Sequence, residues 1–391
     1  MPSVVAVRVL DSHPSSTLVE VEADDGSVGI GLTQSPAAVI RPIIEHGPGG
    51  LRNHLLGEDP RDVDRLWRAM WVGWGAQYGR GSEGGLAVNA MAALDMALWD
   101  LAGKIRGEPV WRLLGGLVQE RVMAYASGSA YVSSSYEGPG PWRRKSPAAL
   151  ADEARTYVGQ GFRAMKFGWG PDFGAEDRAR LRAIREAVGP EVRLMVDIGC
   201  PGYWEPGWSA TAAIGALEIL EEVDAFFVEE PLPPHDVEGH SRVTAVATTV
   251  HVATGESLAT VHEFERFIEA RAVTILQPDA AQIGITQLAA VARRAETAGM
   301  LVAPHSPWSA LAVASHLAVL VTVPNGVLVE YPALATYEAG SRAGEIARLA
   351  NLEIVEHPPL IVDGYLVPFD LPGLGLGGFV PAALEQLAAL K

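Results

Sequence analysis

The sequence has 391 residues, of which 48% are hydrophobic and 20% are charged, and its formal net charge at pH 7 is −17. This length favours about two domains, and the composition is that of an ordinary globular protein. The acidic balance argues against nucleic acid or an anionic membrane as a partner, because such partners are bound by basic patches. A small anionic substrate stays possible, since a metal ion and a few cationic side chains can reverse the local field.

Cysteine content and the N-terminus indicate the compartment. Cys200 is the only cysteine, so an intramolecular disulfide is impossible and a reducing compartment is expected. Residues 1–20 carry no basic flank followed by a long apolar stretch, so no signal peptide is expected. The longest stretch without Asp, Glu, Lys or Arg, 306–329, is interrupted by a Pro-Asn-Gly turn, which favours a buried helix and strand over a membrane span. We therefore expect a soluble cytoplasmic protein.

Residues 1–120 form one predicted α+β unit. Alternating apolar residues predict three strands within 4–32, with a tight turn at Asp24-Asp25-Gly26. An amphipathic helix is predicted over 60–71, because Asp59 is a good N-cap and Pro60 is tolerated at the first helical position. A Gly-rich loop, 71–85, is expected before an Ala-rich helix at 86–105.

From 121 to 358, strand and helix patterns alternate. Helices are predicted at 147–159, 176–188, 209–222, 236–248, 261–270, 283–298 and 308–319. The short apolar segments between them end near Lys166, Asp197, Glu229, Glu256, Asp279, His305 and Glu330. Successive ends lie 23 to 32 residues apart, about one βα unit, which indicates a (β/α) barrel of eight parallel strands. The tail, 359–391, is expected to pack back on the first unit.

Three of these strands end in carboxylates, namely Asp197, Glu229 and Glu256. The carboxyl ends of barrel strands meet at one face, so the three groups would repel one another unless positive charge lay between them. Oxygen ligands of this kind suit Mg²⁺ or another hard divalent ion. The alternative is that they are solvated loop acids. Glu230, one residue further on, is expected to point away into a structural hydrogen bond.

Four other strand ends also carry titratable side chains. Lys166 would face the barrel mouth, where a neighbouring metal would lower its pKa and suit it to act as a base, unless it reaches out to solvent. Asp279 and His305 end adjacent strands, so the carboxylate can fix the imidazole tautomer and raise its basicity. Glu330 closes the ring on the side away from the metal trio.

Several motifs in the same order resemble the mandelate racemase branch of the enolase superfamily, over nearly the whole chain. They are Ala93-Leu-Asp-Met-Ala-Leu-Trp-Asp100 with Gly103-Lys104, Pro109 to Gly116, Val228-Glu-Glu-Pro231, His235-Asp236-Val-Glu-Gly239, Gly255-Glu256 and Gln277-Pro278-Asp279.

The resemblance implies a modified (β/α)₇β barrel under a capping domain built from both ends of the chain. It also implies one Mg²⁺ per subunit on Asp197, Glu229 and Glu256, a His305–Asp279 acid/base dyad, and Glu330 near the substrate carboxylate. We also expect a homo-oligomer.

The chemistry shared by that superfamily is abstraction of a proton α to a carboxylate, with a Lys or His base and Mg²⁺. One departure decides the expected reaction. The racemase pattern has two lysines separated by one residue, whereas this chain has Lys166-Phe167-Gly168. Stereoinversion needs groups on both faces of the substrate, but His305 alone can remove an α-proton and then protonate a departing β-hydroxyl. Tyr78-Gly79-Arg80 also resembles the acid-sugar dehydratases of the family.

We therefore predict a Mg²⁺-dependent dehydratase that converts a sugar acid to a 2-keto-3-deoxy acid. A racemase, epimerase or cycloisomerase on the same scaffold is the first alternative. A metal-binding protein without turnover is the second. Specificity is expected to reside in the loops 24–35, 71–85 and 131–145, of which the last contains the basic run Arg143-Arg144-Lys145. Cys200, Tyr203 and Trp204 are further candidates for lining the pocket.

Overall fold

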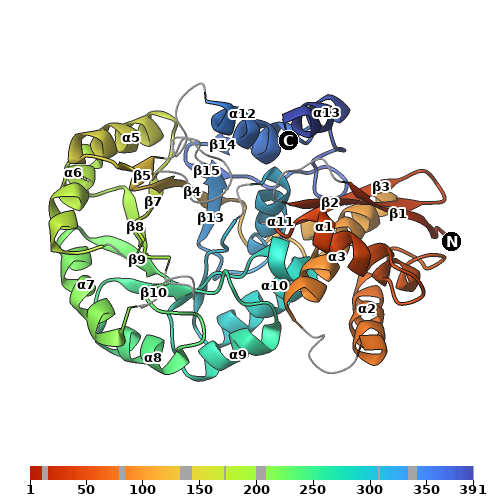
Figure 1. The fold of residues 1–391 in the computed structure, drawn as a ribbon, viewed down its shortest axis with the longest axis horizontal. Coiled ribbons are helices and arrows are strands. Elements are labelled where there is room, and N and C mark those ends of the chain that lie inside the picture. The colour runs from red at the N-terminus through yellow and green to blue at the C-terminus, as the bar shows by residue number, and fades with distance from the viewer. Residues whose placement is uncertain are drawn as a thin grey trace.

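The computed structural model describes residues 1–10, 16–78, 84–132, 143–170, 173–199, 208–306, 309–332 and 341–390. The N-terminal strands and helices lie to one side of a ring of strands surrounded by helices (Figure 1). The last helices of the chain lie along one edge of both.

The N-terminal region, which we call the capping region, is a three-stranded antiparallel meander covered by helices. Its strands are β1 (Val4–Leu10), β2 (Thr17–Ala23) and β3 (Val28–Thr33), in that order across the sheet. Its helical segments are α1 (Ala37–Glu45), η1 (Leu51–His54), α2 (Val63–Tyr78), α3 (Gly85–Arg106) and α4 (Val110–Leu113). The helix predicted over 60–71 therefore begins three residues later and extends further.

Two local contacts explain these shifted bounds. Asp59 does not cap a helix at Pro60, because its carboxylate accepts the backbone N–H of Arg61 at 3.0 Å and pairs with the Arg61 guanidinium. The first part of the predicted loop 71–85 is helical, since α2 continues to Tyr78, and Gly73 within it packs against a side chain. A Cβ at Gly73 would lie 2.1 Å from Cε1 of His54, and this packing overrides the low helix propensity of glycine.

The long helix α3 packs directly on the sheet. A Cβ at Gly31 of β3 would lie 2.0 Å from the carbonyl oxygen of Ala93, so glycine opposite alanine allows the closest approach of helix to strand. By length and composition alone α3 could cross a membrane, but 83% of its most apolar stretch is buried inside the protein.

The barrel consists of eight strands with a helix between each consecutive pair. The strands are β4 (Val122–Ser129), β7 (Ala164–Gly168), β8 (Arg193–Asp197), β9 (Ala225–Glu229), β10 (His251–Thr254), β11 (Ile275–Leu276), β12 (Leu301–Val302) and β13 (Leu328–Pro332). The helices are α5 (Pro147–Gly159), α6 (Arg178–Val188), α7 (Ala210–Glu222), α8 (Val237–Val246), α9 (Val261–Glu269), α10 (Ala280–Thr297) and α11 (Ala310–Leu320).

Every neighbouring pair of these strands is parallel, and the ring is closed. Strands run in sequence order from β4 to β12, and β13 pairs with β4. Val302 N donates to Asn325 O and Val327 N donates to Val302 O, both at 2.9 Å, which joins β12 to the start of β13. The predicted (β/α)₇β barrel with a capping domain is confirmed as the fold class. A short hairpin, β5 (Tyr131–Val132) and β6 (Arg143–Arg144), follows β4.

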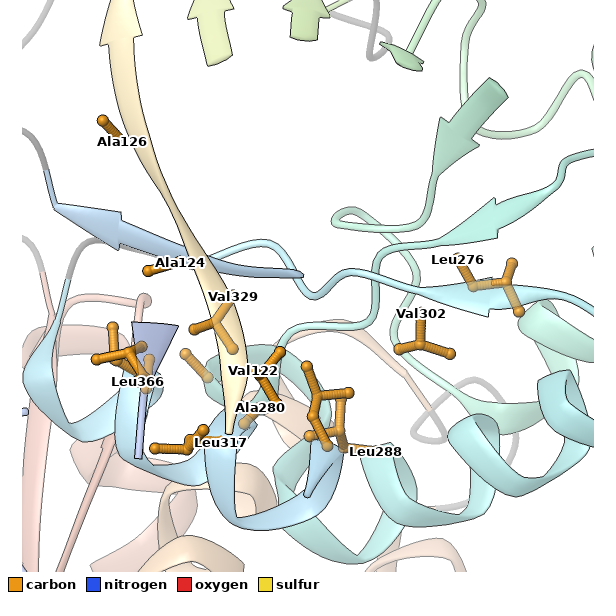
Figure 2. Close-up of a cluster of buried hydrophobic side chains, with 14 of the residues drawn as sticks. Val122, Ala124, Ala126, Leu276, Ala280, Leu288, Val302, Leu317, Val329 and Leu366 are labelled. Carbon is orange, nitrogen blue, oxygen red and sulfur yellow. The ribbon is translucent and has the colours of Figure 1, made fainter. Parts of the chain in front are cut away.

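Strand alternation divides the barrel side chains into two sets. Figure 2 shows Val122, Ala124 and Ala126 along β4, in an outer cluster that includes Leu317 of α11 and Leu288 of α10. The intervening residue Tyr125 belongs instead to a separate cluster inside the barrel. The outward-facing side chains pack against the surrounding helices. The inward-facing side chains fill the barrel interior.

One buried carboxylate of the capping region forms hydrogen bonds to α10. Asp95 of α3 accepts hydrogen bonds from Thr286 N at 2.8 Å and from Thr286 Oγ1 at 2.6 Å. Gly284, with φ of +79°, breaks the helix just before that point. A Cβ there would lie 2.6 Å from Oδ2 of Asp95, so the close approach requires glycine.

The tail contacts both regions. It contains α12 (Arg342–Arg348), η4 (Leu349–Glu353), β14 (Ile361–Val362), β15 (Tyr365–Leu366) and α13 (Pro381–Leu390). β15 pairs antiparallel with β4. Buried Asp100 of α3 accepts N–H groups from Ile30 of β3 at 3.0 Å and from Leu374 of the tail at 2.8 Å. Lys104 donates to Asp100 at 2.7 Å, to Val28 O and to Gly377 O.

Candidate active site

The barrel interior contains an apolar layer, and polar groups lie directly above it. One residue from each barrel strand or its end forms the apolar layer, namely Tyr125, Ala164, Met195, Phe227, Ala253, Ile275, Ala303 and Leu328. Two residues further along each strand, alternation brings the interior-facing positions to Ser127, Lys166, Asp197, Glu229, Gly255, Gln277, His305 and Glu330. Five of the seven predicted site residues lie in this ring, and Glu256 and Asp279 follow it within two positions.

Lys166 lies among three carboxylates. Its side chain is 3% exposed, and Nζ lies 2.9 Å from Glu229 Oε2, 3.2 Å from Glu330 Oε1 and 3.5 Å from Asp197 Oδ2. Burial lowers the pKa of Lys166, but the charges of Glu229 and Glu330 outweigh it and hold that pKa well above its ordinary value. In the protein without metal, these direct contacts with carboxylates govern the pKa, and the lowering expected beside a bound metal stays a prediction.

His305 and Asp279 form the predicted pair. Nδ1 of His305 lies 3.0 Å from Oδ2 of Asp279. Since an ionised carboxylate can only accept, Nδ1 carries a proton, and in the neutral imidazole the lone pair is therefore on Nε2. Nε2 lies 3.4 Å from Glu256 Oε2. Burial lowers the pKa of His305, yet the charge of Glu256 and the hydrogen bond to Asp279 raise it above its ordinary value.

Asp279 is fixed from several sides and has no exposed surface. It is the N-cap of α10, where Oδ1 accepts the N–H of Ala281 at 2.8 Å. The helix predicted from 283 therefore begins at Ala280. Burial would raise the pKa of Asp279, but hydrogen bonds, first that from His305, lower it to about 2. This carboxylate is ionised at neutral pH.

Asp197, Glu229 and Glu256 follow one another around the barrel at the ends of β8, β9 and β10. Asp197 and Glu229 are partners in the register of β8 and β9. Burial raises the pKa of Glu229 to about 8. The charge of Lys166 opposes this rise, and the charges of Asp197 and Glu256 add to it. Among the described residues, Oε1 of Glu229 is buried without a hydrogen-bond partner.

A desolvated, mutually repelling set of oxygen ligands with one unpartnered oxygen fits a hard divalent cation such as Mg²⁺. Within the described ranges, however, no three Asp, Glu, His or Cys side chains are arranged so that they could hold a metal ion as they stand. Lys166 and His305 contact these carboxylates instead. Ligation of Mg²⁺ by Asp197, Glu229 and Glu256 stays a prediction.

Glu230 does not point away from this group as predicted. Its φ is +43°, a left-handed conformation that ends the strand alternation on which the expectation depended. The side chain is buried, and burial together with the charges of Glu256 and Asp197 raises its pKa well above the ordinary value. It also accepts a long hydrogen bond, 3.5 Å, from Ser257 Oγ. Glu230 is therefore a buried carboxyl group beside the trio.

Glu330 lies across Lys166 from Glu229. Oε2 accepts the backbone N–H of Ser306 at 2.9 Å, next to His305 in the chain. Burial raises the pKa of Glu330, but the charges of Lys166 and His305 reverse the shift and lower it.

Sequence reasoning gave no role to two glutamines. Gln277 has no exposed surface, and among the described residues neither its amide nitrogen nor its amide oxygen has a partner. An unpartnered buried amide is unfavourable by about 2–7 kcal/mol, so a ligand in the barrel mouth is its natural partner. Its position two residues after the interior residue Ile275 could have revealed it. Gln34, after β3, donates to Asp279 and could not be found from any local pattern.

Two residues of the basic run at 143–145 form structural ion pairs. Arg144 and Arg180 both pair with buried Asp177, and Lys145 pairs with Glu153. Gly79, Arg80, Cys200, Tyr203 and Trp204 lie outside the described residues, as does the side chain of Tyr78.

Comparison with known proteins supports the same fold. Residues 1–115 match the mandelate racemase / muconate lactonizing enzyme N-terminal domain, and residues 149–377 match the enolase C-terminal domain-like family. A D-galactonate dehydratase from Klebsiella pneumoniae (strain 342) is 30% identical over 377 residues, which cover 93% of this chain and 88% of that protein.

Solved structures agree over almost the full length. A racemase from Streptomyces coelicolor A3(2) with bound magnesium has a TM-score of 0.77 and 27% identity, covering 99% of both chains. The 3,6-anhydro-D-galactonate cycloisomerase from Zobellia galactanivorans has a TM-score of 0.80 and 26% identity, covering 98% of this chain and 99% of that one. These relatives are lyases and isomerases, and they confirm the resemblance inferred from the motifs. The chain belongs to the mandelate racemase and muconate lactonizing enzyme branch of the enolase superfamily.

Proposed function

We propose that this protein is a dehydratase that eliminates water from a sugar acid to give a 2-keto-3-deoxy acid. The observation that carries the proposal is the difference between the two cationic side chains in the ring. Lys166 is enclosed by three carboxylates, whereas His305 keeps Nε2 free of any hydrogen bond to the described residues, with 20% of its side chain exposed. One available base suits elimination.

In the proposed reaction, Nε2 of His305 takes the proton from the carbon α to the substrate carboxylate. The C–H electron pair moves into that carboxylate, and a bound Mg²⁺ would supply positive charge there. The electrons then return, the β C–O bond breaks, and the imidazolium gives its proton to the departing hydroxyl. Water and an enol result, and the enol becomes the 2-keto-3-deoxy acid.

The neighbours of His305 have separate roles in this proposal. Asp279 holds the Nδ1–H tautomer and stabilises the imidazolium. Lys166 provides charge at the substrate carboxylate without taking the proton. Asp197, Glu229 and Glu256 would hold the metal. Glu330 is assigned to a position near the substrate carboxylate, where its own carboxylate keeps the Lys166 ammonium in place.

A racemase, epimerase or cycloisomerase is the second candidate, and one observation favours it. Lys166 comes from β7 and His305 follows β12, three strands apart around the closed barrel, so the two could reach opposite faces of a substrate. Against it, a Cβ at Gly168 would meet only Gly128 O, at 3.7 Å. A Cβ would therefore fit at the position of the second lysine of the racemase pattern, but glycine supplies no base there.

The test is a panel of sugar acids incubated with the full-length protein and Mg²⁺ in D₂O. We expect α-proton exchange and a 2-keto-3-deoxy product with at least one acid, both abolished by EDTA and restored by Mg²⁺. Exchange with inversion and no elimination would establish the isomerase instead. No exchange with any acid would leave a metal-binding protein without turnover.

A further inference from the structure

Gln34 connects the capping region to the His305–Asp279 pair. It follows β3, and its Nε2 donates to Oδ2 of Asp279 at 2.8 Å. This is the same oxygen that accepts Nδ1–H of His305 at 3.0 Å. Oδ1 of Asp279 is bound to Ala281 N at 2.8 Å, so both oxygens of the carboxylate are held.

Gln34 is itself the end of a directed chain of amides. Asn89 of α3 donates through Nδ2 to the side-chain oxygen of Gln282 at 2.6 Å and to its backbone oxygen at 3.1 Å. Gln282 donates through Nε2 to Oε1 of Gln34 at 3.2 Å. Ser35 Oγ donates to the remaining amide oxygen, that of Asn89, at 2.9 Å.

The direction of this chain is fixed from both ends. Asp279 can only accept, so Gln34 must present its NH₂ group to it and its oxygen to Gln282. Gln282 must then present its NH₂ group to Gln34 and its oxygen to Asn89. At the other end, the backbone oxygen of Gln282 requires the NH₂ group of Asn89 on that side. Reversing any one amide would place two donors or two acceptors face to face.

We propose that Gln34 is a positioning residue for proton transfer, which orients the Asp279 carboxylate and through it the imidazole of His305. The inference rests on the proposed function for its catalytic consequence. The orientation of the catalytic base, His305, then depends on how the capping region docks on the barrel. The capping region supplies the donor, Gln34, and the barrel supplies the acceptor, Asp279. Without Gln34, Oδ2 keeps only the His305 hydrogen bond, and the contacts of Oδ1 with Ala281 N and His316 are left to orient the carboxylate.

The first experiment compares kcat and KM of Gln34→Leu with the wild type, using the Mg²⁺-loaded full-length protein. Leucine keeps the approximate volume and removes the donor. We expect kcat to fall about 10-fold or more while KM stays nearly unchanged, as for other residues that orient a histidine through its partner. Thr17→Val is the matched control, because Thr17 Oγ1 donates to Ser35 O at 2.6 Å on the same turn but outside the amide chain. It should leave kcat unchanged.

The decisive measurement is a double-mutant cycle with Asp279→Asn. If Gln34 acts through Asp279, Gln34→Leu should cause little further loss of kcat in the Asp279→Asn background. Equal losses in both backgrounds, or an effect on KM alone, would overturn the proposal.

A readout without turnover separates this inference from the proposed function. In protein labelled with ¹⁵N-histidine, Gln34→Leu should shift the His305 resonances and leave those of His240 and His251 in place. Unchanged His305 resonances would refute the positioning role whether or not any acid is a substrate. Absence of α-proton exchange by the wild type, with shifted resonances in Gln34→Leu, would refute only the proposed function.

Discussion

The two cationic side chains of the barrel mouth are held in different ways. Lys166 is surrounded by carboxylates that all belong to barrel strands, and its side chain is nearly inaccessible. His305 has one hydrogen-bonded carboxylate, Asp279, which is anchored by α10 and by Gln34 of the capping region, and a longer 3.4 Å contact with Glu256. The ammonium group of Lys166 is enclosed by three carboxylates, whereas Nε2 of His305 has only the longer 3.4 Å contact with Glu256 and becomes a base once it loses its proton. Charge alone therefore does not identify a base, and the availability of its lone pair does.

His305→Asn gives the largest expected effect and would break the comparison most directly. Removing the base should lower turnover by about 10²–10⁴-fold and abolish α-proton exchange in D₂O, followed by ¹H NMR. If this variant still exchanges the α-proton of one enantiomer, Lys166 is a base in its own right. Two-sided chemistry, and with it racemisation, then becomes the better interpretation.

Lys166→Met tests the role of the second cationic side chain, the lysine enclosed by carboxylates. Removing one partner of a buried ion pair leaves uncompensated charge, so the metal-free variant should lose about 3–5 kcal/mol in free energy of unfolding. Mg²⁺ should raise its Tm more than that of the wild type, because a cation at Asp197 and Glu229 replaces the lost ammonium. Residual α-proton exchange by His305 is expected. Equal Mg²⁺ stabilisation of variant and wild type would show that the metal lies elsewhere.

Asp95→Asn changes the contact between the capping region and α10, the helix that anchors Asp279. Burial raises the pKa of Asp95 to about 7 from an ordinary value of 3.8, despite the Thr286 hydrogen bonds. Because the folded-state pKa is the higher one, its contribution to stability is fully present below pH 3.8 and is lost as the pH rises through about 7. Across that range the wild type should lose up to about 4 kcal/mol relative to the variant in urea unfolding. A difference independent of pH would contradict this.

Glu330→Gln has the smallest expected effect. It tests which of the carboxylates around Lys166 bind the metal. Turnover should fall about 10- to 100-fold, whereas Mg²⁺ affinity measured by calorimetry should stay nearly unchanged. Glu229→Gln is the matched comparison and should weaken Mg²⁺ binding. A parallel loss of turnover and Mg²⁺ affinity in Glu330→Gln would place Glu330 among the metal ligands.

The strand ends could be predicted from sequence because short apolar runs and their spacing define a barrel, and a barrel brings those ends together. Lys166, Asp279 and His305 were found in this way. The Gln34 contact could not be, since it joins positions 245 residues apart and depends on how the capping region docks. Glu230 was placed wrongly because alternation assumes extended backbone, and its positive φ is set by tertiary structure.

The Asp100 and Lys104 contacts have a consequence for the order of folding during synthesis. Asp100 is translated long before Leu374 and Gly377, yet it needs the tail to complete the hydrogen bonds of its buried carboxylate. Until those residues leave the ribosome, the Asp100 carboxylate of α3 lacks the N–H group that one of its oxygens accepts in the complete protein. The region made first is therefore expected to reach its final packing last, after the barrel has formed, in contrast to the usual N-terminal-first order.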